Sequence, residues 1–158
     1  MAVKQITAFL ENKAGRLLEV TEILSQNGVD LRAINIAETA DYGLLRIIAK
    51  DSDKAEKVLK DAGVICTATP VIAVAVSDRP GGLNGMLKIL AKENIDVNYM
   101  YSIFGHIGGL AYMILQVSDT ENAKKVVLHG LDNFIVSEKG GRILICRRSA
   151  EQSIKEFV

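Results

Sequence analysis

Two kinds of hydrophobic pattern alternate along the chain and predict its elements. Runs rich in β-forming residues, with loose alternation of apolar and polar positions, predict strands. They cover 3–10, 29–38, 43–50, 64–69, 71–76, 95–104, 109–117 and 133–138. Segments whose apolar residues recur every three or four positions predict amphipathic helices. These cover 15–27, 53–62, 81–93 and 119–129. The order strand-helix-strand-strand-helix-strand therefore occurs twice.

Polar residues and glycines mark the ends of the expected helices. Gly28 and Asn94 follow the first helix of each set, where a left-handed residue commonly ends a helix. Ser52-Asp53 and Ser118-Asp119 precede the second helix of each set and are expected to cap it through side-chain oxygens. These boundaries leave short connections throughout, as expected of compact domains.

The second set of elements repeats the first. When residue 12 is placed on residue 78 and the register is held without a gap, 12–53 aligns with 78–119 and gives ten identities. This indicates two copies of one fold. The order of elements is that of a ferredoxin-like βαββαβ domain, an α+β fold with an antiparallel sheet and both helices on one face. We expect domains over 1–69 and 70–138, followed by an extension over 139–158.

Two segments go beyond a simple pair of domains. Residues 110–115 are apolar on both faces of their expected strand, so we expect both faces to be covered. In the extension, 142–146 predicts an extra strand, and Ser149 with Gln152 could cap a short last helix. The extension holds five basic and two acidic residues, which is typical of a solvated sheet edge or of a surface for an acidic partner.

Composition and charge exclude several classes of protein. Nineteen basic residues balance nineteen acidic ones, and both expected domains are slightly acidic, which argues against nucleic-acid binding. No signal peptide and no apolar run of membrane-spanning length are found, so a cytoplasmic protein without a membrane partner is expected. Cys66 and Cys146 both lie in apolar runs and are interpreted as buried free thiols.

The sequence lacks the residues that other functions of this fold require. The loops after the two first strands contain no cysteine pair for a metal, and the third strands lack the aromatic pattern of RNA-recognition modules. Arg16 and Asn35 are the only candidates for phosphate hydrolysis, and the second copy has Gly82 and Tyr101 in their places. His106, expected in a turn, and His129 have no partner in the sequence that suggests a catalytic triad. We expect no catalytic residues, no metal and no cofactor.

The loop between first strand and first helix has the same character in both copies. Asn12-Lys13-Ala14-Gly15-Arg16-Leu17 and Asp78-Arg79-Pro80-Gly81-Gly82-Leu83 both resemble the Asn/Asp-x-Pro-Gly-x-Leu signature of ACT domains, small modules that sense amino acids. Val29-Asp30-Leu31 and Ile95-Asp96-Val97 fit the family as well. The resemblance covers about 3–138 as two tandem copies without an enzyme domain.

The resemblance implies a set of ligand-binding residues in each copy. They are Asn12, Ala14, Gly15, Arg16, Leu17 and Asp30 in the first, and Asp78, Pro80, Gly81, Gly82, Leu83 and Asp96 in the second. Backbone N–H groups at the helix start would face the carboxylate of a free amino acid, and the acids would accept from its ammonium group. The alternative is that Asn12, Asp30, Asp78 and Asp96 only cap helices and turns.

The two copies differ at these positions. The first has Ala14 in place of proline and adds Arg16, while the second has two acids, Asp78 and Asp96. Gly82 and Gly85 each cost about 1 kcal/mol in a helix, so a ligand or the neighbouring domain is expected to pack closely there. The first copy is favoured as the binding site.

The resemblance also implies the function. We expect a non-catalytic, homodimeric regulatory protein that binds a free amino acid at ACT-domain interfaces and signals to an enzyme of amino-acid metabolism. The alternative is a dedicated regulatory subunit of an enzyme such as acetolactate synthase or aspartate kinase. A third possibility is a structural domain pair whose sites no longer bind ligand.

Overall fold

The computed structural model describes residues 3–39, 41–107, 109–129, 134–139 and 142–147. For 104–107, 128–129, 134–139 and 142–147 it describes the course of the backbone alone. Contacts divide the chain into a first unit, Lys4–Thr69, and a second unit, Met1–Val3 with Pro70–Val158. No described helix has the length and apolar character needed to cross a membrane.

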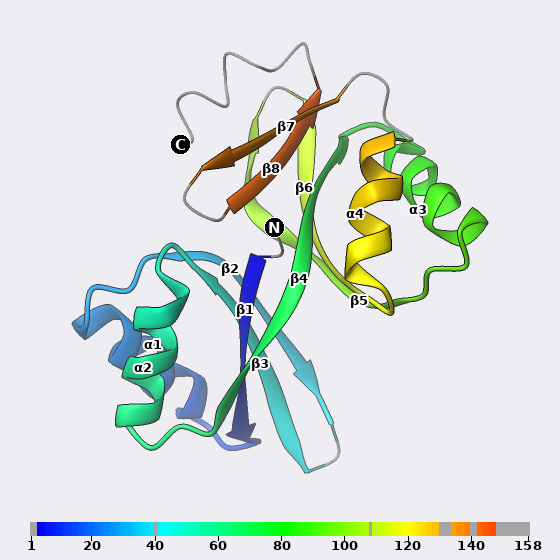
Figure 1. The fold of residues 1–158 in the computed structure, drawn as a ribbon. Coiled ribbons are helices and arrows are strands. Elements are labelled where there is room, and N and C mark those ends of the chain that lie inside the picture. Colours follow the sequence, from blue (N-terminus) through cyan, green and yellow to red (C-terminus); the bar gives the residue numbers. More distant parts are fainter. Residues whose placement is uncertain (1–2, 40, 108, 130–133, 140–141, 148–158) are drawn as a thin grey trace. The chain divides into compact units, whose positions relative to one another are not determined.

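The first unit is an antiparallel sheet with two helices on one face (Figure 1). Its elements are β1 (Val3–Glu11), α1 (Arg16–Gln26), β2 (Leu31–Glu38), β3 (Tyr42–Ala49), α2 (Ser52–Asp61) and the start of β4 (Cys66–Ser77). The strand order is β2-β3-β1-β4. This is the ferredoxin-like plan that the sequence predicts.

The second unit has the same order of elements from the remainder of β4 onwards, but its last strand is not part of the main sheet. Its elements are α3 (Gly82–Lys92), β5 (Val97–Ile107), β6 (Leu110–Val117), α4 (Thr120–His129), β7 (Phe134–Lys139) and β8 (Arg142–Arg147). The strand order is β4-β6-β5, and β7 pairs with β8 in a separate two-stranded sheet. The extra strand expected over 142–146 is therefore present, and it takes the last strand of the repeat as its partner.

Two boundaries differ from the sequence-based expectation. The strands expected over 64–69 and 71–76 form one strand, β4, because Pro70 adopts an extended backbone that a strand can continue through. The expected turn residue His106 lies in β5, opposite Ala111 of β6. The last helix expected after Ser149, and Gly130, lie outside the described residues.

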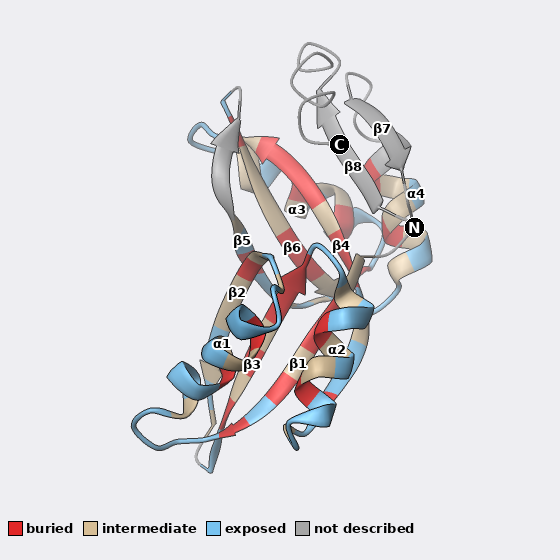
Figure 2. Ribbon diagram, turned by 90° about the vertical axis from the view of Figure 1, so that its left-hand side faces the viewer, coloured by how far each residue is buried: buried red, intermediate tan, exposed pale blue. Residues whose placement is uncertain are grey.

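The cores of the two units use equivalent positions (Figure 2). Up to the end of the first helix, equivalent residues of the two units are separated along the chain by the same number of residues as 12 and 78. In this part Ile6, Ala8, Leu10, Val20 and Leu24 correspond to Ile72, Val74, Val76, Met86 and Leu90. After the hairpin this separation is larger by two residues. There Ile47, Ala49, Ala55 and Leu59 correspond to Leu115, Val117, Ala123 and Val127.

The change in spacing arises in the second hairpin, between β5 and β6. Asn35 pairs with Arg46 in the first unit, whereas Tyr101 pairs with Ile114 in the second. The gapless alignment places residue 35 on residue 101 but residue 46 on residue 112, so it does not match the observed pairing with Ile114. The gapless alignment through residue 53 is therefore wrong. The second hairpin is longer by two residues. Matches beyond it in the gapless alignment, such as Ser52 with Ser118, therefore do not mark equivalent positions.

The caps of the second helices follow the corrected spacing. Asp51 precedes α2 and accepts a hydrogen bond of 2.9 Å from the Lys54 N–H. Asp119, its equivalent in the second unit, accepts one of 2.9 Å from the Asn122 N–H. Asp119 is thus confirmed as a cap. In the first unit the cap is Asp51, whereas Ser52 donates to the Lys4 carbonyl at 3.0 Å.

The Asp51 cap gives a testable prediction. Asp51→Ala should lower the free energy of unfolding by about 1 kcal/mol, because the first turn of α2 loses an acceptor for its N–H groups. Asp51→Asn should cost much less, since asparagine caps nearly as well. Urea denaturation of both variants measures the difference. Equal losses for alanine and asparagine would show that the charge, and not the cap, stabilises the helix.

Both faces of β6 are buried, as the sequence predicts. Leu115 faces the helices and belongs to the second core. Its neighbour Ile114 faces the other way, and both are fully buried. Tyr101 and Ala75, which belong to the same outer face, are also buried. The outer face of β6 is thus buried at Ile114 and partly buried at Tyr112 and Gln116.

Candidate functional site

The two candidate loops, Asn12–Gly15 and Asp78–Gly81, join a strand to the helix that follows it. Each helix begins after a glycine with positive φ, 87° at Gly15 and 88° at Gly81. A glycine reaches this left-handed conformation without the clash that a Cβ would cause. Neither cap position makes a side-chain hydrogen bond. Gly15 and Gly81, and not Asn12 and Asp78, therefore occupy the cap positions themselves.

Asn12 connects the first loop to the β2–β3 hairpin. Its side-chain Nδ2 donates to the carbonyl of Thr39 at 3.1 Å. Its Oδ1 lies 3.3 Å from the point that a Cβ on Gly43 would occupy, and the Ile36 Cδ1 lies 3.5 Å from the same point. Asn12 and Ile36 therefore both lie beside Gly43, and Ile36 remains 51% exposed.

Sequence reasoning missed the contributions of Ile36, Thr39 and Gly43. A signal for them was available in the expected order of strands. An antiparallel hairpin next to the first strand places its turn beside the end of that strand. The pairings Glu11 with Tyr42 and Glu38 with Gly43 show that arrangement.

Arg16 begins α1 and carries the first positive charge after the loop. One of its terminal nitrogens, Nη1, contacts Glu19 Oε2 at 2.5 Å. Its Nε is buried and has no hydrogen-bond partner among the described residues. A buried donor without an acceptor is unfavourable and is usually satisfied by water or a ligand. The neighbouring Leu17 and Leu18 are exposed.

The backbone donors differ from those that we expected to bind a carboxylate. The Arg16 N–H donates to the Lys13 carbonyl at 3.3 Å, and the Gly82 N–H donates to the Arg79 carbonyl at 2.9 Å. These two groups are already used within their loops. The next N–H groups of each helix, at residues 17–18 and 83–84, belong to the first turn, which has no acceptor within the helix.

The second loop is held more closely to its strand than the first. The Asp78 N–H donates to the carbonyl of Gly109 at 2.9 Å. A Cβ built on Gly82 would lie 1.9 Å from the carbonyl oxygen of Ser77, so no other residue fits there without movement. Gly82 thus packs on its own strand, not on a ligand or a neighbouring domain. A Cβ on Gly85 would meet nothing within 4 Å.

Asp30 and Asp96 lie far from the loops of their own units. The carbonyl of Asp30 accepts from the Lys50 N–H at 2.9 Å, and Asp96 is held similarly by Ser118. Because β1 and β2 both pair antiparallel to β3, the start of β2 and the end of β1 are at opposite ends of the sheet. The eight residues of β2 separate the two ends by roughly 25 Å. No unit brings its two polar residues together.

The remaining charges of the first loop neutralise one another. Lys13 Nζ lies 2.8 Å from Glu11 Oε2, and this hydrogen bond lowers the pKa of the Glu11 carboxyl. Both side chains are largely exposed, so the pair stabilises the fold little. Arg16 is paired with Glu19 through Nη1, so only its remaining guanidinium nitrogens could bind an anionic ligand.

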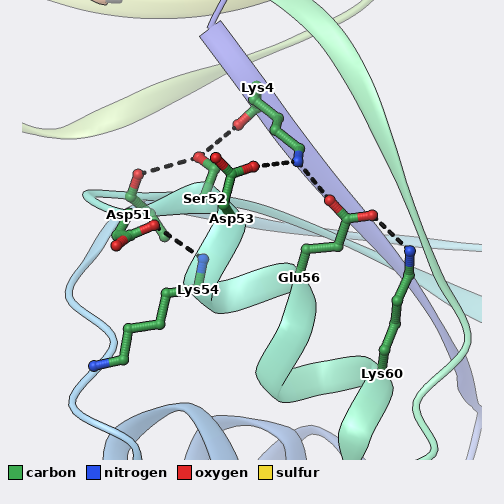
Figure 3. A network of polar contacts seen from close by, with 8 residues as sticks. Lys4, Asp51, Ser52, Asp53, Lys54, Glu56 and Lys60 are labelled. Atoms are coloured by element: carbon green, nitrogen blue, oxygen red, sulfur yellow. Dashed lines mark hydrogen bonds and ion pairs between the residues drawn. The ribbon is translucent and has the colours of Figure 1, made fainter. Parts of the chain in front are cut away.

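The densest polar network lies elsewhere, between β1 and α2 (Figure 3). Lys4 Nζ contacts Asp53 Oδ1 at 2.6 Å and Glu56 Oε2 at 2.5 Å. Lys60 contacts the other Glu56 oxygen at 2.7 Å. The Lys4 and Lys60 contacts lower the pKa of Glu56 to about 2. This network ties α2 to the first strand and is interpreted as structural.

The Glu56 pKa predicts how stability depends on pH. Because this pKa is lower in the folded protein than the ordinary value of 4.5, ionised Glu56 stabilises the fold above about pH 4.5. That contribution should be lost as the pH falls from 4.5 towards 2. Urea denaturation across this range should show a shallower loss for Glu56→Gln than for the unchanged protein. Identical slopes would contradict the assignment.

Other reactive groups are few among the residues whose side chains are described. Cys66 is a buried free thiol, as expected, and its burial raises the pKa of the thiol. The Cys146 side chain lies outside that set. No group of three or more histidine, cysteine, aspartate or glutamate side chains in the described part could hold a metal ion.

Comparison with known proteins identifies the class that this fold and these loops define. Residues 1–144 match the family described as ACT domain pair. The chain belongs to this family. No curated protein matches the sequence significantly.

Several solved structures share the fold. Protein BT0572 from Bacteroides thetaiotaomicron is 34% identical, with a TM-score of 0.78 and coverage of 94% of each chain. The ligand-free regulatory subunit of aspartate kinase from Thermus thermophilus is 15% identical, with a TM-score of 0.61 and coverage of 82% of this chain and 93% of that one. The corresponding subunit from Thermus flavus is 12% identical, with a TM-score of 0.57 and coverage of 84% and 95%. At these lower identities the likeness shows the fold alone.

Proposed function

We propose that this ACT domain pair is a cytoplasmic, non-catalytic regulatory protein that binds a free amino acid at the loop before α1. The observation that carries the proposal is the polar arrangement around Asn12 and Arg16, in the loop that matches the family signature. Asn12 is positioned by Thr39 at 3.1 Å, and Arg16 keeps a buried Nε without a partner among the described residues.

The loop offers complementary groups to a zwitterion. The Arg16 guanidinium and the first-turn N–H groups of α1 would bind the carboxylate, where the helix dipole favours a negative charge. The Oδ1 of Asn12 would accept a hydrogen bond from the ammonium group. Asp30 is left out of this proposal because its own unit places it at the opposite end of the sheet.

Binding would act by changing how copies of the chain associate. We propose a homodimer whose packing depends on ligand and is recognised by an enzyme of amino-acid metabolism. Such coupling requires that the ligand binds one arrangement more tightly than the other. An exposed loop that binds at the surface of a unit is well placed for that role, since loops carry most binding residues.

A thermal-shift screen against the common amino acids tests the proposal. A ligand present at 100 times its dissociation constant should add about 2.7 kcal/mol to the free energy of unfolding. Asn12→Ala should weaken the shift, and Asp78→Ala, at the equivalent position of the second loop, is the matched control. No shift with any amino acid would rule out the proposed function at ordinary affinities.

The second candidate function is that of a permanent regulatory subunit of a larger enzyme. The fold likeness to regulatory subunits of aspartate kinase over more than four-fifths of this chain favours it. A permanent subunit should remain bound to its enzyme during purification without added ligand. A sensor that acts only when loaded should bind the enzyme only in the presence of the amino acid.

A further inference from the structure

The two loops, although built on equivalent positions, present different chemistry. At the spacing that places residue 12 on residue 78, four positions of the first unit, Asn12, Arg16, Leu18 and Ile36, correspond to Asp78, Gly82, Asn84 and Ser102 of the second. The first loop thus combines an amide, a cation and two exposed aliphatic side chains. The second combines a carboxylate, a glycine and two polar side chains.

At two positions the first loop suits a carboxylate better than the second. Gly82 stands where the first unit has Arg16, and Asp78 stands where it has Asn12, while Lys13 and Arg79 place one cation inside each loop. A carboxylate near Asp78 would be repelled, whereas one near Arg16 would form a charge-assisted hydrogen bond.

Space favours the first loop as well. In the second loop the start of α3 lies so close to Ser77 that Gly82 cannot carry a Cβ. In the first loop a whole arginine side chain extends from the equivalent position, and its Nε is buried. The first loop therefore accommodates a side chain at the position where the second loop cannot.

An exposed aliphatic side chain lies near Asn12. Ile36 lies beside Gly43, as the Asn12 amide does, and is 51% exposed. On the first turn of α1, Leu18 is 60% exposed. Large aliphatic side chains are more often buried, and exposed ones grouped at a polar site are typical of ligand-binding surfaces. Nothing comparable is found at the equivalent described positions of the second loop, since Ser102 and Asn84 are polar.

We infer that the first loop alone binds ligand and that it selects an amino acid with an aliphatic side chain. The inference rests on the proposed function. Arg16 and Asn12 hold the charged groups of the ligand, and the aliphatic side chain contacts Ile36. The second loop acts as a structural connection between β4 and α3.

Isothermal titration of the full-length chain with leucine, valine, alanine, serine and aspartate tests the inference. Leucine or valine should bind more tightly than serine or aspartate, with one site per chain. Ile36→Ser, which copies the second loop, should weaken leucine binding roughly ten-fold and leave alanine binding nearly unchanged. Ile36 is half exposed, so this change should not unfold the protein, and a thermal melt of the variant checks that.

Two further variants test which of the two loops binds the ligand. Arg16→Ala should weaken every amino acid by a similar factor, because each has the same carboxylate. Asp78→Ala should change no affinity. Preference for a polar amino acid, or loss of binding in Asp78→Ala alone, would overturn the inference while leaving the proposed function intact. Absence of binding by all five amino acids would overturn the inference, and a thermal-shift screen in which no common amino acid binds would overturn the proposed function as well.

Discussion

Gly82→Ala is expected to destabilise the protein by roughly 3 kcal/mol or more, among the largest effects of any single substitution. The new Cβ would lie 1.9 Å from the Ser77 carbonyl oxygen, and both atoms belong to the backbone framework of the second unit. Relief would require α3 to move away from the end of β4. That movement would also disturb the core contacts of Met86 and Leu90.

Gly85→Ala is the matched control, in the same helix and one turn later. A Cβ at Gly85 meets nothing within 4 Å, so alanine should stabilise the helix by up to about 1 kcal/mol. Guanidinium denaturation of the two variants measures both effects. Stabilisation by alanine at both positions would show that the close approach at Gly82 is absent in solution.

Leu24→Ala should cost about 3 kcal/mol, the second large effect. Leu24 is only 1% exposed and contributes to the core between α1 and the first sheet. Truncation removes buried methyl groups and leaves a cavity that the surrounding residues fill only in part. The free energy of unfolding, measured by denaturant titration, reports the loss.

Leu18→Ala provides the comparison on the same helix. Leu18 is 60% exposed, so its truncation should change stability by no more than about 0.5 kcal/mol. A large loss at Leu18 would show that another copy of the chain or another segment covers this residue in solution. The pair therefore separates the role of Leu24 in folding from the exposed position of Leu18 near the loop.

The sequence was sufficient to predict the helices, the order of strands and the family, because these depend on periodicity and on local motifs. It did not reveal that the second hairpin is longer than the first by two residues. A shift by one would have moved every side chain of β6 to the wrong face, but a shift by two preserves the alternation. The pairings of Arg46 with Asn35 and of Ile114 with Tyr101 were needed to detect it.

The candidate site was predictable only in part. The motif indicated Asn12 and Arg16 because the family signature is local in sequence. It could not show that Ile36 approaches Asn12, since that contact depends on the register of β2 against β3. Nor could it show that Asp30 lies at the opposite end of the sheet. The role of Gly82 likewise depends on a distance to Ser77, which no propensity encodes.

The continuous strand β4 has a consequence for engineering. Its twelve residues are shared by the two units, whose boundary lies between Thr69 and Pro70, and it pairs with β6 from Ile72 onwards. A gene fragment that ends between the repeats would divide this strand and expose its free backbone groups as an edge. The two copies therefore cannot be exchanged or expressed as separate parts without a new boundary being designed within β4.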